Sequence, residues 1–370
     1  MSEPQEAGDV PPILTLDRRL WIEVKDSDEE IFDIYSRLAG STETSSGAPI
    51  TSVGQKSGNG LGFLDSSSSV LEIELEIHQP KGVNSQNGSE VTLENFSSKK
   101  RGRSYKSKPK QRVLATRTIT AQLHQDIYAI NHRKGDTGSV VWRASVDFAE
   151  LLWYDLLYPA NRGIDELCDS LLNMNLLVSS LRILELGSGT GALAVLCNKM
   201  FPSDSQSSWT VSDQSSLLST ISRNLTLNKL THVNEFQHPS QYQVEEIDWL
   251  EIEKDWMKIN LKPDLDEIQS SYDLILAIDC LYNESLILPF LHTLDHIAKP
   301  QSSDGRSATL VLIVSQLRSE EVMRLFVESW IKLPFWKIFR VDLDGLRSDL
   351  KLDLSHPKYV VWFGWKVKSR

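Results

Sequence analysis

The sequence predicts an α/β fold with a mostly parallel sheet and helices on both of its faces. Short apolar runs alternate with helical patterns from about residue 140 onward, as expected for strands joined by helical crossovers. A glycine-rich segment, GSGTG at 187–191, directly follows one of these runs and precedes a helical pattern. The last two runs, 336–343 and 358–367, have no helical pattern between them, so we expect an antiparallel hairpin at one edge.

The individual elements follow from the same patterns. Apolar runs bounded by polar or glycine-containing segments indicate buried strands, whereas apolar residues spaced three and four apart indicate helices. The strand that should follow the helix at 215–228 has no clear pattern. We expect strands at 181–186, 208–213, 272–279, 308–315, 336–343 and 358–367, and helices at 146–157, 165–177, 191–200, 215–228, 286–298 and 319–331.

Composition divides the chain into an irregular N-terminal extension, 1–135, and an α/β domain, 136–370. Within the extension, VLEIELEI at 70–77 alternates apolar and acidic residues, which predicts a strand with one buried face. The segment 116–130 is the expected partner strand. The extension should therefore carry a strand pair interrupted by loops.

A helix is expected near the start of the extension, in SDEEIFDIYSRLAG at 27–40. Ser27 should be its N-cap, with Glu30 in the capping-box position. Gly40 should end the helix.

Charge and composition exclude several classes of protein. The net charge of −11 argues against nucleic-acid affinity across the whole surface. No stretch approaches the ~20 apolar residues of a membrane helix, and the acidic N-terminus does not resemble a signal peptide. The three cysteines, Cys168, Cys197 and Cys280, lack metal-site spacing, so we expect no metal and a reducing compartment. We expect the cytoplasm, with the nucleus as a further location.

The glycine loop predicts a ligand site. Gly187, Gly189 and Gly191 can adopt positive φ and allow close approach of the backbone to a ligand. Asp213 ends the next strand, where a carboxylate can accept from ribose hydroxyls. The spacing fits the loops that bind dinucleotides and those that bind S-adenosylmethionine, and alone it does not separate them.

Two details favour S-adenosylmethionine. Glu185 precedes the loop and can orient it or accept from the ammonium group of the cofactor, whereas it would repel a pyrophosphate. Downstream, LILAIDCLYNES at 274–285 ends a strand with Asp279, followed by Tyr282. This polar group lies where a second substrate should meet the cofactor.

These motifs resemble those of the seven-β-strand protein-lysine methyltransferases. The shared features are ELGSGTG, VSDQ, a D-x-x-Y motif at 279–282, and TGSVVWRASVDFAELLWY at 137–154, in which a Trp precedes the first helix. Within that group the chain is similar to the fungal ribosomal lysine N-methyltransferase 5 family. The resemblance implies a Rossmann-like seven-stranded class I methyltransferase sheet that binds S-adenosyl-L-methionine.

The resemblance also implies residue roles. Trp142 should pack against the cofactor, Gly187, Ser188 and Gly189 should cradle its amino-acid end, Asp213 should bind the ribose, Trp249 should lie by the adenine, and Ile278 should line the pocket. Asp279 and Tyr282 should orient the lysine amine.

The implied substrate is a large-subunit ribosomal protein of the mobile stalk, modified by a monomeric enzyme. The tract KKRGRSYKSKPKQR at 99–112 holds eight Lys or Arg and no acid, so contact with ribosomal RNA or a nuclear-import signal is one interpretation. A solvated loop is the other. Low-complexity segments at 40–60 and 82–98 also predict loops.

Other functions remain open at this stage. A nucleic-acid methyltransferase would carry an [N/D]-P-P-[Y/F/W] motif or a Pro-Cys nucleophile, and neither is present. A nicotinamide dehydrogenase would leave the D-x-x-Y motif unexplained. A non-catalytic, ribosome-associated protein that binds S-adenosylmethionine is the third alternative.

Overall fold

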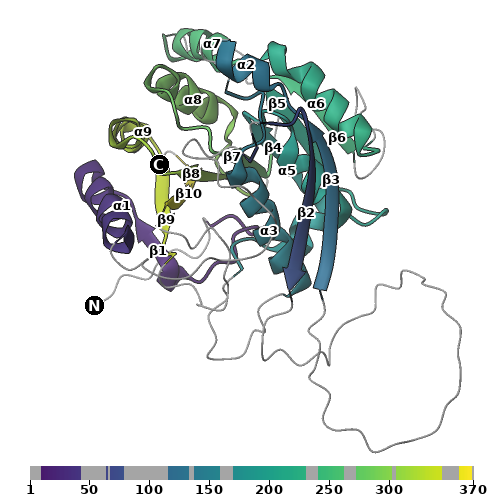
Figure 1. Cartoon of the computed structure of the whole chain (residues 1–370). Helices are drawn as coiled ribbons and strands as arrows, with labels where there is room; N and C mark the ends of the chain where they lie inside the picture. Colours follow the sequence, from purple (N-terminus) through teal and green to yellow (C-terminus); the bar gives the residue numbers. More distant parts are fainter. Residues whose placement is uncertain are drawn as a thin grey trace, which may run out of the picture.

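A central eight-stranded sheet lies between two layers of helices, as the computed structural model shows (Figure 1). The α/β fold class predicted from the sequence is confirmed. The structure describes residues 10–42, 64–65, 67–78, 116–132, 137–158, 170–230, 241–261, 272–301, 306–343 and 358–368.

The strand order of the large sheet is β1-β9-β10-β8-β7-β4-β5-β6. The strands are β1 Trp21–Glu23, β4 Arg182–Leu186, β5 Ser208–Asp213, β6 Gln241–Glu246, β7 Leu274–Ile278, β8 Leu310–Gln316, β9 Trp336–Val341 and β10 Tyr359–Lys366. Strands β4 to β8 are mutually parallel, and the predicted hairpin is present because β9 and β10 pair antiparallel. The chain winds in opposite directions from the neighbours β4 and β7, which makes their carboxyl ends the expected place for a ligand.

The helices form one layer on each face of this sheet. They are α1 Ser27–Thr42, α2 Ile127–His132, α3 Arg143–Leu157, α4 Met174–Ser180, α5 Ala192–Cys197, α6 Ser215–Leu227, α7 Trp249–Leu261, α8 Glu284–Ile297 and α9 Glu320–Lys332, with 3-10 turns at Arg18–Leu20 and Asn198–Met200. Side chains alternate along β4, so Ile183 enters the core with α3 and α5, whereas Leu184 enters the core with α8 and α9. The sheet therefore has an apolar core on each of its two faces.

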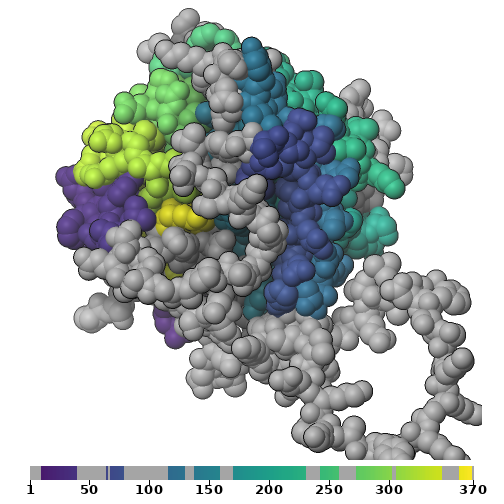
Figure 2. Space-filling model, in the orientation of Figure 1, coloured from purple at the N-terminus to yellow at the C-terminus, as the bar shows by residue number. Residues whose placement is uncertain are grey.

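The eighth strand was not predicted. The resemblance implied seven strands, and β1 extends the sheet by pairing antiparallel with β9, Ile22 opposite Arg340. Helix α1 follows β1 and packs beside α9, as the purple and yellow-green surfaces of Figure 2 show. The N-terminal extension therefore contributes directly to the main sheet and to one helix layer.

The start of α1 differs from the sequence prediction. Asp26, not Ser27, caps the helix, because Asp26 Oδ1 accepts from the amides of Asp28 and Glu29 at 2.8 and 2.9 Å. The helix also continues past Gly40 to Thr42.

Glu30 does not form a capping box. Its carboxylate turns into the core, where Oε2 lies 2.9 Å from Arg340 Nε and Oε1 accepts from Trp362 Nε1 at 2.7 Å. The side chains of Glu30 and Arg340 are 4% and 3% exposed. A buried ion pair thus joins α1 to β9 and β10.

A separate two-stranded sheet consists of β2 Val70–His78 and β3 Thr116–His124, paired antiparallel. Its apolar face packs on α3, α5 and α6, as the alternation in 70–77 predicted. The expected strand at 116–130 ends early, because Asp126 Oδ1 accepts from the Ala129 amide and starts α2.

Asn224 of α6 connects this small sheet to the glycine loop. Its Nδ2 donates to the carbonyls of His124 and Thr190, both at 2.9 Å, and its Oδ1 accepts from the His124 amide at 2.7 Å. The side chain is fully buried. The extension and the loop are therefore held by one shared anchor.

Several sequence-based expectations lie outside the described residues. These are the basic tract 99–112, the segment 82–98, residues 43–60, Cys168, and the first part of the helix expected at 165–177. Across the described parts of the chain, no helix has the length and apolar character needed to cross a bilayer, and no cluster of metal-ligating side chains occurs.

Candidate functional site

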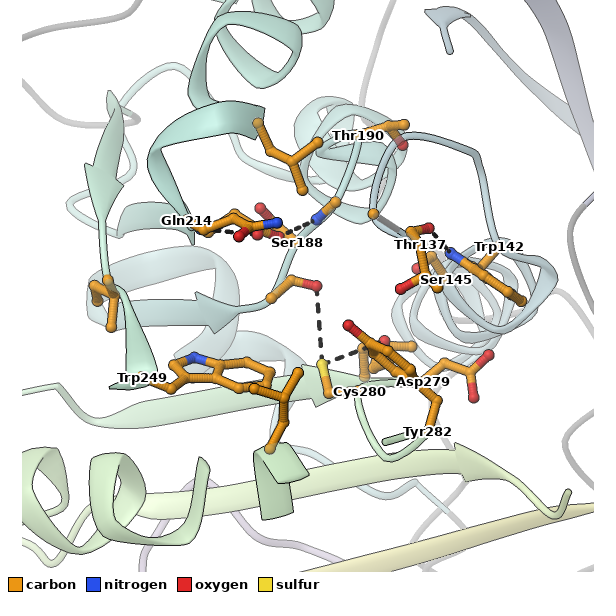
Figure 3. Close-up of a pocket in the computed structure, with 18 of the residues that line it drawn as sticks. Thr137, Trp142, Ser145, Ser188, Thr190, Gln214, Trp249, Asp279, Cys280 and Tyr282 are labelled. Carbon is orange, nitrogen blue, oxygen red and sulfur yellow. Dashed lines mark hydrogen bonds between the residues drawn. The ribbon is translucent and has the colours of Figure 1, made fainter. Parts of the chain in front are cut away.

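A cavity of about 490 Å³ lies at the carboxyl ends of the parallel strands (Figure 3). Segments that follow β4, β5, β6, β7 and β8 all contribute to its wall, together with residues just before and within the start of α3. The lining residues are Thr137, Gly138, Val140, Trp142, Ser145, 187–190, Asp213, Gln214, Leu217, 247–250, 278–280, Tyr282, Leu286 and Arg318.

The glycine loop has the predicted backbone conformation. Gly187, Gly189 and Gly191 have φ of 64°, 59° and 73°, a region that favours glycine. A Cβ at Gly189 would lie 2.8 Å from the Gly138 carbonyl oxygen, and one at Gly187 would lie 2.9 Å from Cys280 Sγ. Close packing within the protein therefore requires these two glycines. Gly191 is not part of the cavity lining and instead precedes α5.

Asp213 supports the loop from the end of β5. Its Oδ2 accepts from the Gly189 amide at 2.8 Å, and its Oδ1 accepts from the Gln214 amide at 2.8 Å. Ser188 is fixed to the same strand, because its amide donates to the Ser212 carbonyl at 2.9 Å. A carboxylate has about four acceptor positions, so these two amides do not saturate Asp213.

Glu185 does not reach the cavity. It points away from the loop because strand alternation places it on the α5 side of the sheet, where its Oε2 accepts from Trp209 Nε1 at 3.1 Å. Burial raises the pKa of the Glu185 carboxyl to about 8, the Trp209 hydrogen bond opposes this rise, and the charge of Asp213 adds to it. The raised pKa favours the protonated form of this internal acid, and a carboxyl group outside the cavity lining does not fit the expected contact with a cofactor ammonium.

Three predicted apolar residues line the cavity. Trp142 precedes α3, and its Nε1 donates to the Thr137 carbonyl at 2.9 Å. Trp249 begins α7 and packs on Phe290, with ring centroids 5.0 Å apart. Ile278 ends β7. Figure 3 shows Trp249 on one side of the cavity and Trp142 on the other, with space between them.

Asp279 and Tyr282 also lie at the cavity, beside Trp142 (Figure 3). Asp279 has φ of 61°, uncommon for a residue other than glycine. Its side chain is only 2% exposed, whereas Tyr282 is 38% exposed at the rim. The two groups therefore differ: one is an enclosed carboxylate and the other is an accessible phenol.

Arg318 was not predicted, yet it is the closest partner of Asp279. Its Nη1 and Nη2 donate to Oδ1 and Oδ2 of Asp279 at 2.7 and 2.6 Å, and its guanidinium carbon lies 5.1 Å from the centre of the Trp142 ring. The available signal was its place in the segment QLR at 316–318, directly after the strand expected at 308–315. By the rule that ligands bind beyond the carboxyl ends of strands, this segment was a candidate.

The chemical character of the cavity changes from one end to the other. The 187–190 backbone and Asp213 form a polar end suited to hydroxyl and amino groups. Ile247, Trp249 and Leu250 form an apolar wall suited to a flat ring. Asp279, Tyr282 and Arg318 provide a third, polar region for reacting groups.

Comparison with known proteins gives a family match. A family model described as lysine methyltransferase matches residues 122–329. The chain is 26% identical over 254 residues to ribosomal lysine N-methyltransferase 5 of Zygosaccharomyces rouxii, covering 62% of this chain and 76% of that protein. It is 27% identical over 341 residues to the Candida glabrata protein of the same name, covering 82% and 90%.

Solved structures resemble this one only weakly. An O-methyltransferase from Bacillus cereus in complex with SAH is 12% identical with a TM-score of 0.33, covering 65% of this chain and 86% of that one. A score this low supports no inference about ligand or function.

Proposed function

The chain belongs to the lysine methyltransferase family, and on that premise we propose that it transfers a methyl group from S-adenosyl-L-methionine to the side-chain amine of a protein lysine. The observation that supports this proposal most strongly is that the glycine loop, Asp213 and the Asp279–Tyr282 motif line the same cavity. Cofactor-binding and acceptor-binding groups thus share one space.

The residues of the cavity fit this cofactor. Asp213 would accept from the ribose hydroxyls, and the backbone at Gly187, Ser188 and Gly189 would hold the amino-acid end. Trp249 and Ile278 would enclose the adenine in the apolar part, and Trp142 would cover the opposite side. A volume of about 490 Å³ is within the usual range for pockets that bind ligands of this size.

When bound, S-adenosyl-L-methionine supplies a sulfonium methyl group, whose C–S bond breaks as the amine lone pair forms the new N–C bond. The protein must present that lone pair in a neutral amine. At pH 7 a lysine with a pKa of ~10.4 requires roughly 4–5 kcal/mol to lose its proton. Desolvation in an enclosed cavity lowers this cost.

Asp279 and Tyr282 would orient the acceptor amine. Tyr282 is 38% exposed and lines the cavity, and its hydroxyl is a group that could accept from or donate to the incoming nitrogen. Asp279 is held in an ion pair by Arg318, so its role is positioning and not proton abstraction. Positioning in line at ~3–3.5 Å can supply much of the rate enhancement.

The substrate is proposed from the relatives. Both named relatives are ribosomal lysine N-methyltransferases, and one alignment covers most of each chain. These names support a ribosomal substrate, and from the family resemblance we propose a large-subunit ribosomal protein of the mobile stalk. The basic tract 99–112 is a candidate contact for ribosomal RNA in the cytoplasm or nucleus.

The test is mass spectrometry of ribosomal proteins from cells with and without this chain, combined with transfer of labelled methyl groups by the purified protein to ribosomes from the deficient cells. We expect one large-subunit protein to lose a 14-Da increment on lysine, or a multiple of it, and to regain the label in vitro. Label on RNA and not on protein would support the nucleic-acid alternative. Cofactor binding without transfer would support the non-catalytic one.

A further inference from the structure

We propose that Arg318 is a positioning residue of the transfer site, which holds Asp279 as a neutral ion pair so that lysine enters as a free amine instead of an ammonium ion. This inference rests on the proposed function. Its first support is the charge of the side chains that line the cavity. Of the described residues that line the cavity, Asp213, Asp248 and Asp279 carry carboxylates, and Arg318 carries the single positive charge.

The geometry of the pair determines what Asp279 can bind. Arg318 contacts both carboxylate oxygens in the two-pronged arrangement that gives strong, directional binding. Oδ1 also accepts from the Gln316 amide at 3.1 Å, and Gln316 Oε1 accepts from Arg318 Nη2 at 2.9 Å. Most of the acceptor capacity of the carboxylate is therefore already used by Gln316 at the end of β8 and by Arg318 just beyond it.

Arg318 is itself held in place. Trp142 covers the guanidinium at 5.1 Å, and the Trp142 indole is tied to the Thr137 carbonyl. The side chain of Arg318 is nevertheless 25% exposed and borders the cavity. The pair therefore faces the place where the acceptor nitrogen would enter.

The pairing has a consequence for the reaction. An unpaired Asp279 would attract a lysine ammonium and stabilise the form that has no lone pair. Pairing with Arg318 offsets that attraction, so that the sulfonium charge and desolvation are left to disfavour an ammonium. Asp279 can then orient the amine without raising the cost of deprotonation.

The first test measures the electrostatic effect without catalysis. S-adenosyl-L-methionine and S-adenosylhomocysteine differ by a methyl group and one positive charge. The ratio of their affinities, measured by calorimetry, therefore reports the electrostatic potential that the protein creates at the sulfur position. Arg318→Gln should shift this ratio roughly three- to tenfold toward the charged ligand, and Asp279→Asn should shift it the other way. The double variant Arg318→Gln/Asp279→Asn should return to within about twofold of the wild-type ratio.

The second test is kinetic, with ribosomes from deficient cells as the acceptor. Arg318→Gln should lower kcat at neutral pH with an equal or lower KM, and rate should recover as pH rises. Arg318→Lys keeps the charge but loses the two-pronged contact, so its ligand ratio should stay near wild type. If Arg318→Gln does not fold, the shift of the ligand ratio in Asp279→Asn provides the test, and an unchanged ratio there would contradict the inference.

The outcomes separate the two proposals. If the wild-type protein binds neither ligand, the proposed function and this inference both fail. If the wild-type protein binds both ligands, and Arg318→Gln changes neither the ratio of their affinities nor the values of kcat and KM, the inference about Arg318 fails while the proposed function stands.

Discussion

Two arginine–carboxylate pairs in this molecule have the same chemistry but different surroundings. Glu30 and Arg340 join α1 to the antiparallel edge of the sheet, and both side chains are almost wholly enclosed, at 4% and 3% exposed. Asp279 and Arg318 lie at the carboxyl ends of the parallel strands, where Arg318 is 25% exposed and borders a cavity. An ion pair sealed on all sides can only serve the fold, whereas one that borders a cavity can also act on a ligand.

The hydrogen bonds of the two pairs support this distinction. Both oxygens of Glu30 are used within the core, by Arg340 and Trp362, and Asp33 adds a second acceptor for Arg340 at 3.3 Å. The other pair is contacted by Gln316 at the end of β8 and by the Trp142 ring before α3, and both of these residues are near or in the cavity wall. The first pair therefore connects distant segments, while the second arranges one wall of a pocket.

The largest effect should come from breaking the sealed pair. Arg340→Met leaves the Glu30 charge buried and uncompensated, so we expect a loss of about 3–5 kcal/mol in the free energy of unfolding, measured by urea denaturation. Adding Glu30→Gln removes the charge and keeps an acceptor for Trp362, so the double variant should recover a large part of the loss. If the double variant is no more stable than Arg340→Met, burial of the unpaired charge is not the cause.

The same comparison shows what the sequence could not reveal. The helix at 27–40 and the acid at position 30 were both visible, but local spacing suggested a capping box. The actual partner, Arg340, is 310 residues away. Long-range pairing of charges leaves no periodic signal, so sequence patterns predict where elements lie far better than which side chains meet.

The accuracy of the predicted sheet depended on burial. The strand expected at 272–279 was found because its core, LILAI at 274–278, is a central strand that is apolar on both faces. Strand β6, QYQVEE, escaped detection because it lies at the sheet edge and carries polar residues. Its neighbour α7 was missed with it, although Trp249, the first residue of that helix, was proposed for the pocket and does line it.

Within the site, residues that end a recognisable strand pattern were easier to predict than residues that only the three-dimensional fold brings to the cavity. Asp213 and Asp279 end apolar runs, and both line the cavity. Glu185 also lies near a strand end, but it is two residues before Gly187, and strand alternation turns it to the opposite face. Arg318 belongs to no motif, so only the strand-end rule could have indicated it.

Glu185 extends the comparison to a buried carboxyl group that pairs with no cation among the residues that the structure describes. Its folded-state pKa of about 8 exceeds the ordinary value of 4.5, so the folded protein holds a proton that the unfolded chain releases. Stability should therefore fall as pH rises from about 4.5 to 8. Glu185→Gln keeps the acceptor for Trp209 and cannot ionise, so its advantage over wild type should grow by about 2–4 kcal/mol between pH 5 and 8.

Thermal or urea unfolding of both proteins across this pH range provides the measurement. Because all other titrating groups are common to the two proteins, the difference between the curves isolates position 185. Parallel curves would mean that the Glu185 carboxyl is not neutral in the folded protein.

The smallest effect on stability should come from the pair at the cavity. Arg318→Met removes a cation that is 25% exposed, and the Gln316 amide still donates to the Asp279 carboxylate, so we expect a loss of only about 1–2 kcal/mol in the free energy of unfolding. The same substitution should have a large effect on the relative affinity for charged and neutral adenosyl ligands. Arg340→Met should show the opposite pattern. It should lose much stability but, under conditions in which it is folded, it should keep the wild-type ratio of affinities for the two ligands. If Arg318→Met destabilises the protein as much as Arg340→Met does, then both pairs are elements of the fold, and exposure to the cavity would not distinguish them.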